Sequence, residues 1–216
     1  RTMDQLQQIQ DDEYSLPYHY VSQFKNGFTQ TFFDNWGINH CATIECLLHK
    51  LNQESTESII DVGCGDGRLV CELQEAFAEK TISGIDYSTR AIALAKAINP
   101  RGDYKQLDII NQELSQQYDM AILMEVFEHI DPSLAIAFVE GIRKLLKPGG
   151  KLWVTVPHEN KAVEYKHYRH FTGESLVACF EKHFTVNEII PFEKGKKRKK
   201  IIDALLGNRF FILNSN

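Results

Sequence analysis

A glycine-rich turn is the feature that most constrains what this chain can fold into. Residues 61–67 read Asp-Val-Gly-Cys-Gly-Asp-Gly, at the end of the apolar run 58–62 and before a helical pattern over residues 68–77. Glycines at such a strand-to-helix junction allow a tight turn and let a ligand approach the backbone where a Cβ would collide. On this motif alone, an ordinary turn and a dinucleotide site both remain open.

Strand and helix patterns alternate from residue 58 to about residue 190. The predicted strands cover residues 58–62, 81–85, 103–107, 119–124, 151–156 and 185–190, and the predicted helices cover residues 68–77, 89–98, 132–146 and 174–183. This alternation is typical of right-handed βαβ units on a parallel sheet with helices on both faces. We therefore expect an α/β fold with a doubly wound, mostly parallel sheet. Residues 208–213 read as a final strand or as a docking segment, and we assign them as a strand.

The residues ahead of this pattern are expected to form a separate N-terminal part. With 216 residues, the chain suits one domain with appendages. We predict a helical and aromatic cap over residues 1–55, with a helix near residues 38–52, and a core over residues 56–216. Residues 14–20 are expected to act as a lid that excludes water from a ligand site, and residues 24–36 to pack on the sheet. The alternative is that both aromatic segments only pack.

Charge is unevenly distributed along the chain. Of 24 basic residues, six lie in the run 194–200. The rest of the chain therefore has 18 basic and 29 acidic residues. A body this acidic argues against a nucleic-acid partner, because phosphate contacts need basic surface. The basic run is typical of a solvated loop, and it would also suit an anionic or membrane-attached partner.

Composition excludes several classes of protein. Hydrophobic residues make up 43% and charged residues 25%, the balance of a globular domain. No stretch approaches the roughly 20 apolar residues that span a bilayer, and the first residues do not resemble a signal peptide. We therefore expect a cytoplasmic protein that is not an integral membrane protein. The five cysteines form no CxxC pair, which favours reduced thiols over disulfides or a zinc site.

Two carboxylates follow the next two predicted strands. Asp86 ends the second strand, 19 residues after Gly67, and Asp108 follows the third. The carboxyl ends of parallel strands meet at one edge of a sheet, where ligands of open α/β folds bind. A carboxylate at the position of Asp86 can accept hydrogen bonds from a ribose diol.

Together with Leu-Lys-Pro-Gly-Gly at residues 146–150, these features resemble class I S-adenosylmethionine-dependent methyltransferases over about residues 56–190. A dinucleotide fingerprint would place its third glycine one residue later. The resemblance implies a Rossmann-like sheet of seven strands that ends in an antiparallel strand. It also implies that S-adenosylmethionine is the cofactor.

The same resemblance implies a role for each residue at this edge. Asp86 should bind the ribose hydroxyls, and Asp108 should accept a hydrogen bond from the adenine amino group. The other expected cofactor-binding residues are Asp61, Gly63, Cys64 and Gly65 at the methionine part, Tyr87 against the adenine, Ile109 beside Asp108, and Glu125.

A possible metal site follows the fourth predicted strand. Residues 124–130 read Met-Glu-Val-Phe-Glu-His-Ile, and a helical turn here would put Glu125, Glu128 and His129 on one face. This set suits Mg²⁺ moderately and Mn²⁺, Fe²⁺, Co²⁺ or Zn²⁺ somewhat better. The ExxEH pattern resembles the O-methyltransferases of ubiquinone biosynthesis and the Hen1-type enzymes that methylate the 2′-oxygen of small RNAs. The alternative is a polar pocket wall that holds no metal.

Three histidines are candidates for a general base. His167, Arg169 and His170 precede a Phe-Thr helix start, a pattern that resembles ubiquinone-type and sugar-modifying methyltransferases. His129, His167 or His170 could accept the proton of an acceptor hydroxyl, whereas the alternative is that they only pack.

These observations favour transfer of a methyl group from S-adenosylmethionine to a hydroxyl of a small molecule, a phenol or a sugar, with Mg²⁺ or Mn²⁺ as a possible second cofactor. One alternative is a Hen1-like RNA 2′-O-methyltransferase, against which the acidic body argues. The other is a cofactor-binding module without turnover. The sequence leaves the oligomeric state open.

Overall fold

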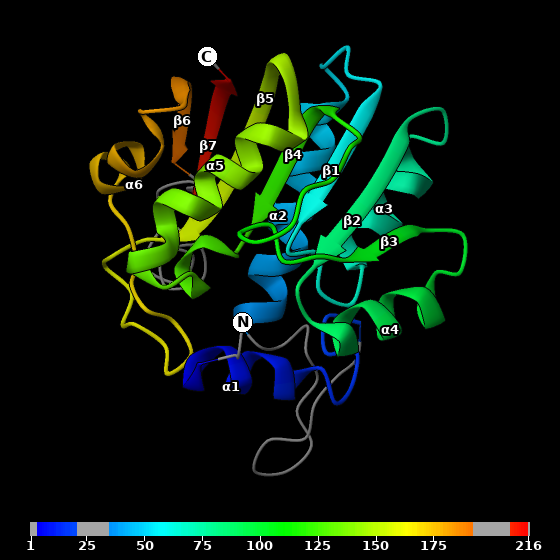
Figure 1. The fold of residues 1–216 in the computed structure, drawn as a ribbon, viewed down its shortest axis with the longest axis horizontal. Helices are drawn as coiled ribbons and strands as arrows, with labels where there is room; N and C mark the ends of the chain where they lie inside the picture. The colour runs from blue at the N-terminus through cyan, green and yellow to red at the C-terminus, as the bar shows by residue number, and fades with distance from the viewer. Residues whose placement is uncertain (1–3, 21–34, 192–207, 216) are drawn as a thin grey trace, which may run out of the picture.

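Seven strands form one sheet at the centre of the molecule (Figure 1). The computed structural model describes residues 4–20, 35–191 and 208–215. The sheet order is β3-β2-β1-β4-β5-β7-β6, and only β7 runs antiparallel to its neighbours among these strands. The strands are β1 (Ser58–Val62), β2 (Thr81–Asp86), β3 (Asp103–Gln106), β4 (Tyr118–Met124), β5 (Leu146–Pro157), β6 (Phe184–Pro191) and β7 (Asn208–Ser215). The predicted doubly wound, mostly parallel sheet and its antiparallel last strand are confirmed.

Helices cover both faces of this sheet, which explains why its strands are apolar without alternation. All five residues of β1 are buried. One hydrophobic cluster joins β1 to Leu47, Leu73 and Ile92, whereas a second joins it to Val139 and Leu176 on the other face. The helices on the first face are α2 (Asn35–Leu51), α3 (Arg68–Ala76) and α4 (Thr89–Ile98), and those on the second are α5 (Ala135–Leu145) and α6 (Gly173–Phe180).

The boundary between α5 and β5 differs from the prediction. A helix was expected over residues 132–146 and a strand from residue 151, but β5 begins at Leu146, which pairs with Tyr118 of β4. The register then shifts before the main run of pairs. Gly149, with a φ of 76°, permits the left-handed backbone in this irregular part. Residues 132–134 form the short 3₁₀ turn η3 (Pro132–Leu134) ahead of α5.

A short helix that the sequence analysis did not predict begins the described chain. α1 (Gln5–Glu13) is capped by Asp4, whose side chain accepts from the Gln7 amide while the Gln7 side chain accepts from the Asp4 amide. This reciprocal pair satisfies amides that would otherwise lack partners at the helix start. Figure 1 shows α1 lying across the ends of the strands where β1, β2 and β4 finish. Tyr14 and Tyr18, which follow α1 in the sequence, have buried side chains.

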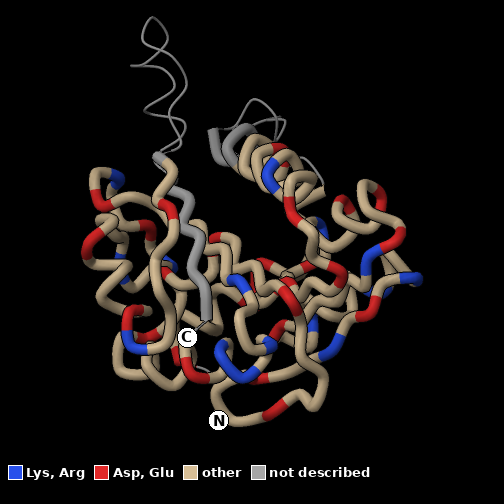
Figure 2. Tube along the Cα trace, turned by 90° about the horizontal axis from the view of Figure 1, so that it is seen from above, with Lys and Arg blue, Asp and Glu red and all other residues tan. Residues whose placement is uncertain are grey.

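Some predictions concern parts of the chain that the structure does not describe. The basic run 194–200 and most of the aromatic segment 24–36 lie outside the described residues. The domain boundary near residue 55 stays a prediction. Residues on its two sides pack together, because α2 and β1 share one hydrophobic cluster. Within the described residues, acidic and basic positions are interspersed along the trace (Figure 2). None of their helices has the length and hydropathy of a membrane span.

Candidate active site

The glycine turn is packed too closely for side chains. Gly63 and Gly65 have φ angles of 77° and 56°. A Cβ on Gly63 would lie 2.6 Å from a Val126 methyl, and one on Gly65 would lie 2.7 Å from the Tyr14 hydroxyl. The amides of Gly63 and Cys64 both donate to the Ile85 carbonyl, at 2.8 and 3.0 Å. The turn is thereby fixed against the end of β2, and only glycine meets both the backbone and the packing demands.

Buried carboxylates lie beside this turn. Asp86 accepts from the Gly65 amide at 2.9 Å and from the Ser88 amide at 2.8 Å. Burial raises the pKa of Asp86 to about 6, although these two N–H donors oppose the shift. Burial, and then the nearby Asp86 charge, raises the pKa of Asp61 to about 8. Both groups would gain from a ligand that donates hydrogen bonds or brings positive charge.

A first cavity contains most of the expected adenosine-binding residues. Gly63, Asp86, Tyr87, Asp108, Ile109 and Glu125 all line it. Leu6, Gln7, Gln10 and Tyr14 of the N-terminal part close the same cavity. The Tyr87 hydroxyl donates to the Gln7 carbonyl at 3.1 Å, which ties α1 to the end of β2. The sequence analysis missed α1, although the capping pattern Asp4-x-x-Gln7 was a signal for it.

A second cavity continues from the first. Asp61 and Cys64 line one part of it, whereas Glu128, His129 and His167 line another. The two cavities share the lining residues Gln10, Tyr14, Gly63, Glu125 and His129. The Tyr18 and His19 side chains also contribute, so part of the segment 14–20 stands over the cavity as the lid hypothesis requires. The geometry is that of two joined ligand sites beneath one cap.

The sequence analysis also missed an ion pair that holds this cap. His19 Nδ1 lies 2.6 Å from Asp66 Oδ1, and the His19 amide donates to Asp66 Oδ2 at 3.1 Å. The Asp66 side chain is completely buried. The His19 ring stacks on His40 with centroids 4.9 Å apart. Because Asp66 belongs to the glycine turn, this pair ties the segment 14–20 to the part of the site that the turn forms.

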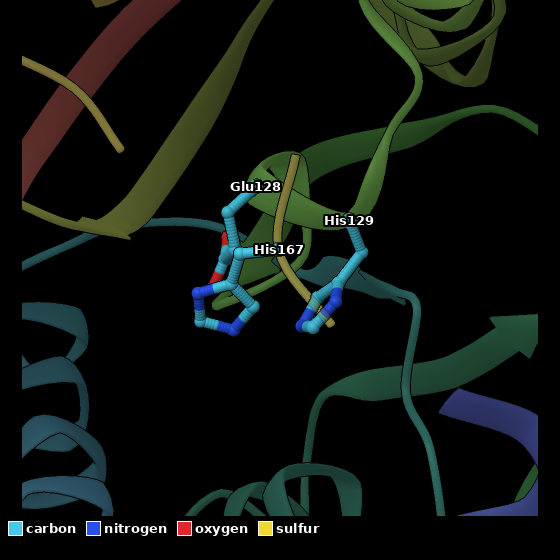
Figure 3. A group of neighbouring side chains, drawn as sticks. All are labelled: Glu128, His129 and His167. Carbon is cyan, nitrogen blue, oxygen red and sulfur yellow. The ribbon is translucent and has the colours of Figure 1, made fainter. Parts of the chain in front are cut away.

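The group of side chains that gathers after β4 differs from the expected one. Glu128, His129 and His167 each offer a ligand atom, and these atoms lie within 4.8 Å of one another. Figure 3 shows the three side chains extending to the same side of their backbone segments. Glu128 and His129 lie on the 3₁₀ turn η2 (Phe127–His129), whereas His167 comes from the loop after β5.

Glu125 was expected in this group, but it is not among the residues whose ligand atoms gather within 4.8 Å, although it lines the same cavity. Its φ of 55° interrupts the helical turn that would have aligned it with Glu128. Its carboxylate accepts a hydrogen bond from Thr155 Oγ1 at 2.9 Å. The expectation that Glu125, Glu128 and His129 share one helical face is therefore wrong, because the chain leaves β4 through a left-handed residue and not through a helix.

The trio of Glu128, His129 and His167 fits a divalent cation on electrostatic grounds. Glu128 is 1% exposed, and its Oε2 has no hydrogen-bond partner among the described residues. Burial, followed by the Glu125 charge, raises the pKa of Glu128 well above its usual range. Burial lowers the pKa of His129 to about 3 and that of His167 to about 2. Neutral imidazoles and a carboxylate with an unpartnered oxygen are groups that a cation would stabilise.

The remaining predicted residues lie in the loop that carries His167. His170 Nε2 lies 2.8 Å from His167 Nδ1, and burial lowers the pKa of His170. The Arg169 guanidinium lies over the rings of Phe127 and Phe171, at 5.4 and 5.1 Å from their centroids. Arg169 therefore packs beneath the site and does not line it. 

This loop is also tied to α1. Lys166 Nζ and the Tyr165 hydroxyl both donate to Glu13, at 2.6 and 2.7 Å, and Tyr168 donates to Asp4. The cap thus contacts the cofactor side and the His167 loop at once.

Comparison with known proteins assigns this architecture. A family model described as a methyltransferase domain matches residues 60–152. Residues 60–152 are thus similar in sequence to methyltransferase domains. The chain is similar in fold to the N-methyltransferase NodS from Bradyrhizobium japonicum WM9, solved with S-adenosyl-L-homocysteine, at a TM-score of 0.71 and 15% identity over 98% of this chain and 99% of that one.

Two other proteins show how widely the acceptors of similar methyltransferases vary. The magnesium protoporphyrin IX methyltransferase from Synechocystis PCC 6803, solved with bound S-adenosylmethionine, has a TM-score of 0.71 and 16% identity, over 100% of this chain and 99% of that chain. The ubiquinone biosynthesis O-methyltransferase of Pseudomonas entomophila (strain L48) is 28% identical over 113 residues, which are 48% of this chain and 46% of that protein. The methyltransferase thus spans about half the length of this curated relative. The fold alone therefore does not identify the acceptor of this chain.

Proposed function

We propose that this methyltransferase transfers the methyl group of S-adenosylmethionine to a hydroxyl oxygen of a small molecule, a phenol or a sugar. The observation that carries the proposal is the position of Glu128, His129 and His167 in the second cavity, which is continuous with the one that contains Asp86. A cluster of this kind at the far end of a cofactor site would act on the acceptor.

The cofactor side would work through buried carboxylates and a close backbone. Asp86 would accept from the ribose hydroxyls, and Asp108, with Ile109 beside it, would face the adenine with Tyr87. Asp61, Cys64 and the two glycines of the turn would face the methionine part, and Glu125 would stand between the two cavities. When bound, S-adenosylmethionine supplies a methyl group on a sulfonium centre. The protein's contribution is alignment, which alone can be worth about 7–11 kcal/mol.

The acceptor side would hold a divalent cation, Mg²⁺ or Mn²⁺, on Glu128, His129 and His167. The chemistry that such a cation supplies is a lower pKa of a hydroxyl in contact with it. His129 and His167 would otherwise serve as bases. Their low pKa values disfavour that role, because a general base works best with a pKa near the working pH.

The kind of acceptor is proposed from charge. Lys161 and Lys166 line the second cavity beside Glu125, Glu128 and Glu164, so these two lysines would be the groups that meet an anionic acceptor, free or attached to a membrane. The similarity to ubiquinone biosynthesis O-methyltransferases supports oxygen as the methylated atom. A Hen1-like RNA substrate and a cofactor-binding module without turnover are outcomes of the test below.

The test incubates the protein with S-adenosylmethionine labelled in its methyl group and either a cell metabolite extract or a small-RNA pool. We expect label in a small molecule, loss of that labelling with a chelator, and recovery with Mg²⁺ or Mn²⁺. Label in RNA would favour the Hen1-like alternative. Cofactor binding by calorimetry without labelling of either pool would favour the inactive module.

A further inference from the structure

Two histidines of the loop after β5 are joined by a direct hydrogen bond. His167 Nδ1 lies 2.8 Å from His170 Nε2, and His170 Nδ1 lies 3.1 Å from the Lys161 carbonyl oxygen. The three groups therefore form a short chain that begins at a backbone carbonyl and ends at His167. His167 is the member of the trio that comes from a different segment from Glu128 and His129.

The direction of these hydrogen bonds follows from what each group can donate. A carbonyl oxygen only accepts, so the nitrogen of His170 that faces Lys161 must carry hydrogen. A neutral imidazole has one N–H, so His170 Nε2 is an acceptor. The hydrogen between the two rings then belongs to His167 Nδ1. The lone pair of His167 is consequently left on Nε2, which lies 3.9 Å from Glu164 Oε2, beyond hydrogen-bond distance.

His129 reaches the same state by a simpler route. Its Nδ1 lies 3.2 Å from the Lys166 carbonyl oxygen, so it donates from Nδ1 and keeps its lone pair on Nε2. For His129 a backbone group fixes the tautomer. For His167 a side chain does so, and that side chain can be changed without touching the ring itself.

We propose that His170 is a positioning residue that holds His167 in the tautomer with hydrogen on Nδ1, so that Nε2 can act beside Glu128 and His129. This inference rests on the proposed function insofar as it treats His167 as a cation ligand. Hydrogen bonds of this kind to the second nitrogen of a ligating histidine orient the ring and fix its tautomer. His170, a candidate base in the sequence analysis, is thereby given an indirect role.

The first experiment measures the tautomer directly. The protein is labelled with ¹⁵N-histidine, and the ring nitrogens are observed by NMR at about pH 8, where ordinary imidazoles are neutral. We expect the His167 hydrogen on Nδ1 in the unmodified protein. In His170→Ala the ring should become a mixture of tautomers, and in His170→Gln, whose amide oxygen can accept in place of Nε2, the Nδ1–H form should return.

The second experiment measures Mn²⁺ binding to the same proteins by calorimetry, with S-adenosyl-L-homocysteine present. We expect His170→Ala to weaken binding by about 10-fold, the lower end of the effect of removing a partner of a metal-ligating histidine. His170→Gln should stay within about three-fold of the unmodified protein, because it keeps the acceptor. His183→Ala is the matched control, since His183 pairs with Glu140, away from the trio.

Two results would overturn the inference. One is a His167 ring with hydrogen on Nε2 in the unmodified protein. The other is a His170→Ala protein whose His167 tautomer is unchanged. If the unmodified protein binds no Mn²⁺, the proposed cation site is wrong, and the tautomer measurement still decides the role of His170.

Discussion

The proposed cofactor side and the proposed acceptor side of this site are built in different ways. On the cofactor side, the glycine turn, Asp86 and Asp108 each follow the end of one strand, within 48 residues of sequence. On the acceptor side, Glu128 and His129 depend on His167, which a separate loop delivers after β5. The first side is a set of local motifs that the parallel sheet aligns, whereas the second exists only after β4, β5 and their loops have packed.

Burial acts on both sides, and it moves the pKa values of carboxyl groups and of imidazoles in opposite directions. It raises the pKa of Asp61 and Asp86 and lowers that of His129 and His167. In each case the neutral form is favoured, because a buried charge without a partner costs free energy. The comparison teaches that both sides are prepared for ligands that supply the missing charge or hydrogen bonds.

The largest expected effect separates the cofactor side from the rest. Gly65→Val should weaken binding of S-adenosyl-L-homocysteine by at least about 100-fold, or about 3 kcal/mol. The substitution forces a side chain against Tyr14 and adds left-handed backbone strain of roughly 1–2 kcal/mol. Calorimetry measures the affinity, and circular dichroism checks the fold.

Gly149→Val is the matched control for Gly65→Val. Gly149 has a similar φ of 76°, but a Cβ there meets nothing within 4 Å among the described residues. Gly149→Val should lower the stability of the fold without weakening the binding of S-adenosyl-L-homocysteine. Equal affinities in both variants would mean that the turn does not contact the ligand.

The second effect isolates the acceptor side. Glu128→Gln should lower turnover by about 100-fold, the scale at which a group that assists deprotonation contributes. Cofactor affinity should stay within two-fold (about 0.4 kcal/mol), because Asp86 and the turn are untouched. Glu159→Gln, an exposed change in the loop that carries His167, is the control. Full turnover in Glu128→Gln would mean that Glu128, His129 and His167 only form a polar wall of the pocket.

The third effect tests the pKa shift on the cofactor side. Asp86→Asn should cost about 1.5–3 kcal/mol of cofactor affinity, the range for a hydrogen bond to a charged group. Since the pKa of Asp86 is raised to about 6, acidification through pH 6 protonates the carboxylate before the ligand arrives. Affinity in the unmodified protein should therefore fall as the pH decreases from 8 to 5.

The control for this pH dependence is the variant itself. Asp86→Asn should remove the step near pH 6, measured by calorimetry over the same range. A step that remains between pH 6 and pH 8 in this variant would belong to Asp61, because its pKa of about 8 is raised in part by the Asp86 charge that the variant removes. An unchanged step near pH 6 would show that Asp86 does not face the cofactor.

The smallest effect concerns the cap that touches both sides. Glu13→Gln weakens the contacts to Lys166 and Tyr165, and partly exposed ion pairs are typically worth about 0.2–1 kcal/mol. We expect turnover and cofactor affinity to fall together by about two- to five-fold, because α1 lines the first cavity and holds the His167 loop. The control is Glu113→Gln, which breaks an exposed pair of the same 2.6 Å length with Lys144. A loss confined to turnover would place the cap over the acceptor alone.

The fold and the cofactor side were largely predictable from the sequence, for a physical reason. Strands that are buried on both faces produce apolar runs, and a tight turn at a strand end requires glycine. Asp86 and Asp108 could be placed because each follows a strand whose end the pattern reveals. These signals are local, so no knowledge of distant contacts was needed.

The acceptor side was decided by tertiary structure. His167, and not Glu125, joins Glu128 and His129, since Glu125 leaves β4 in a left-handed conformation and His167 arrives from a loop 38 residues after His129. Likewise, α1 is held at the site by partners far from it in sequence, Tyr87 at the end of β2 and Lys166 and Tyr168 in the His167 loop. Sequence periodicity describes neighbours along one element, whereas contacts between loops depend on how the finished sheet brings their ends together.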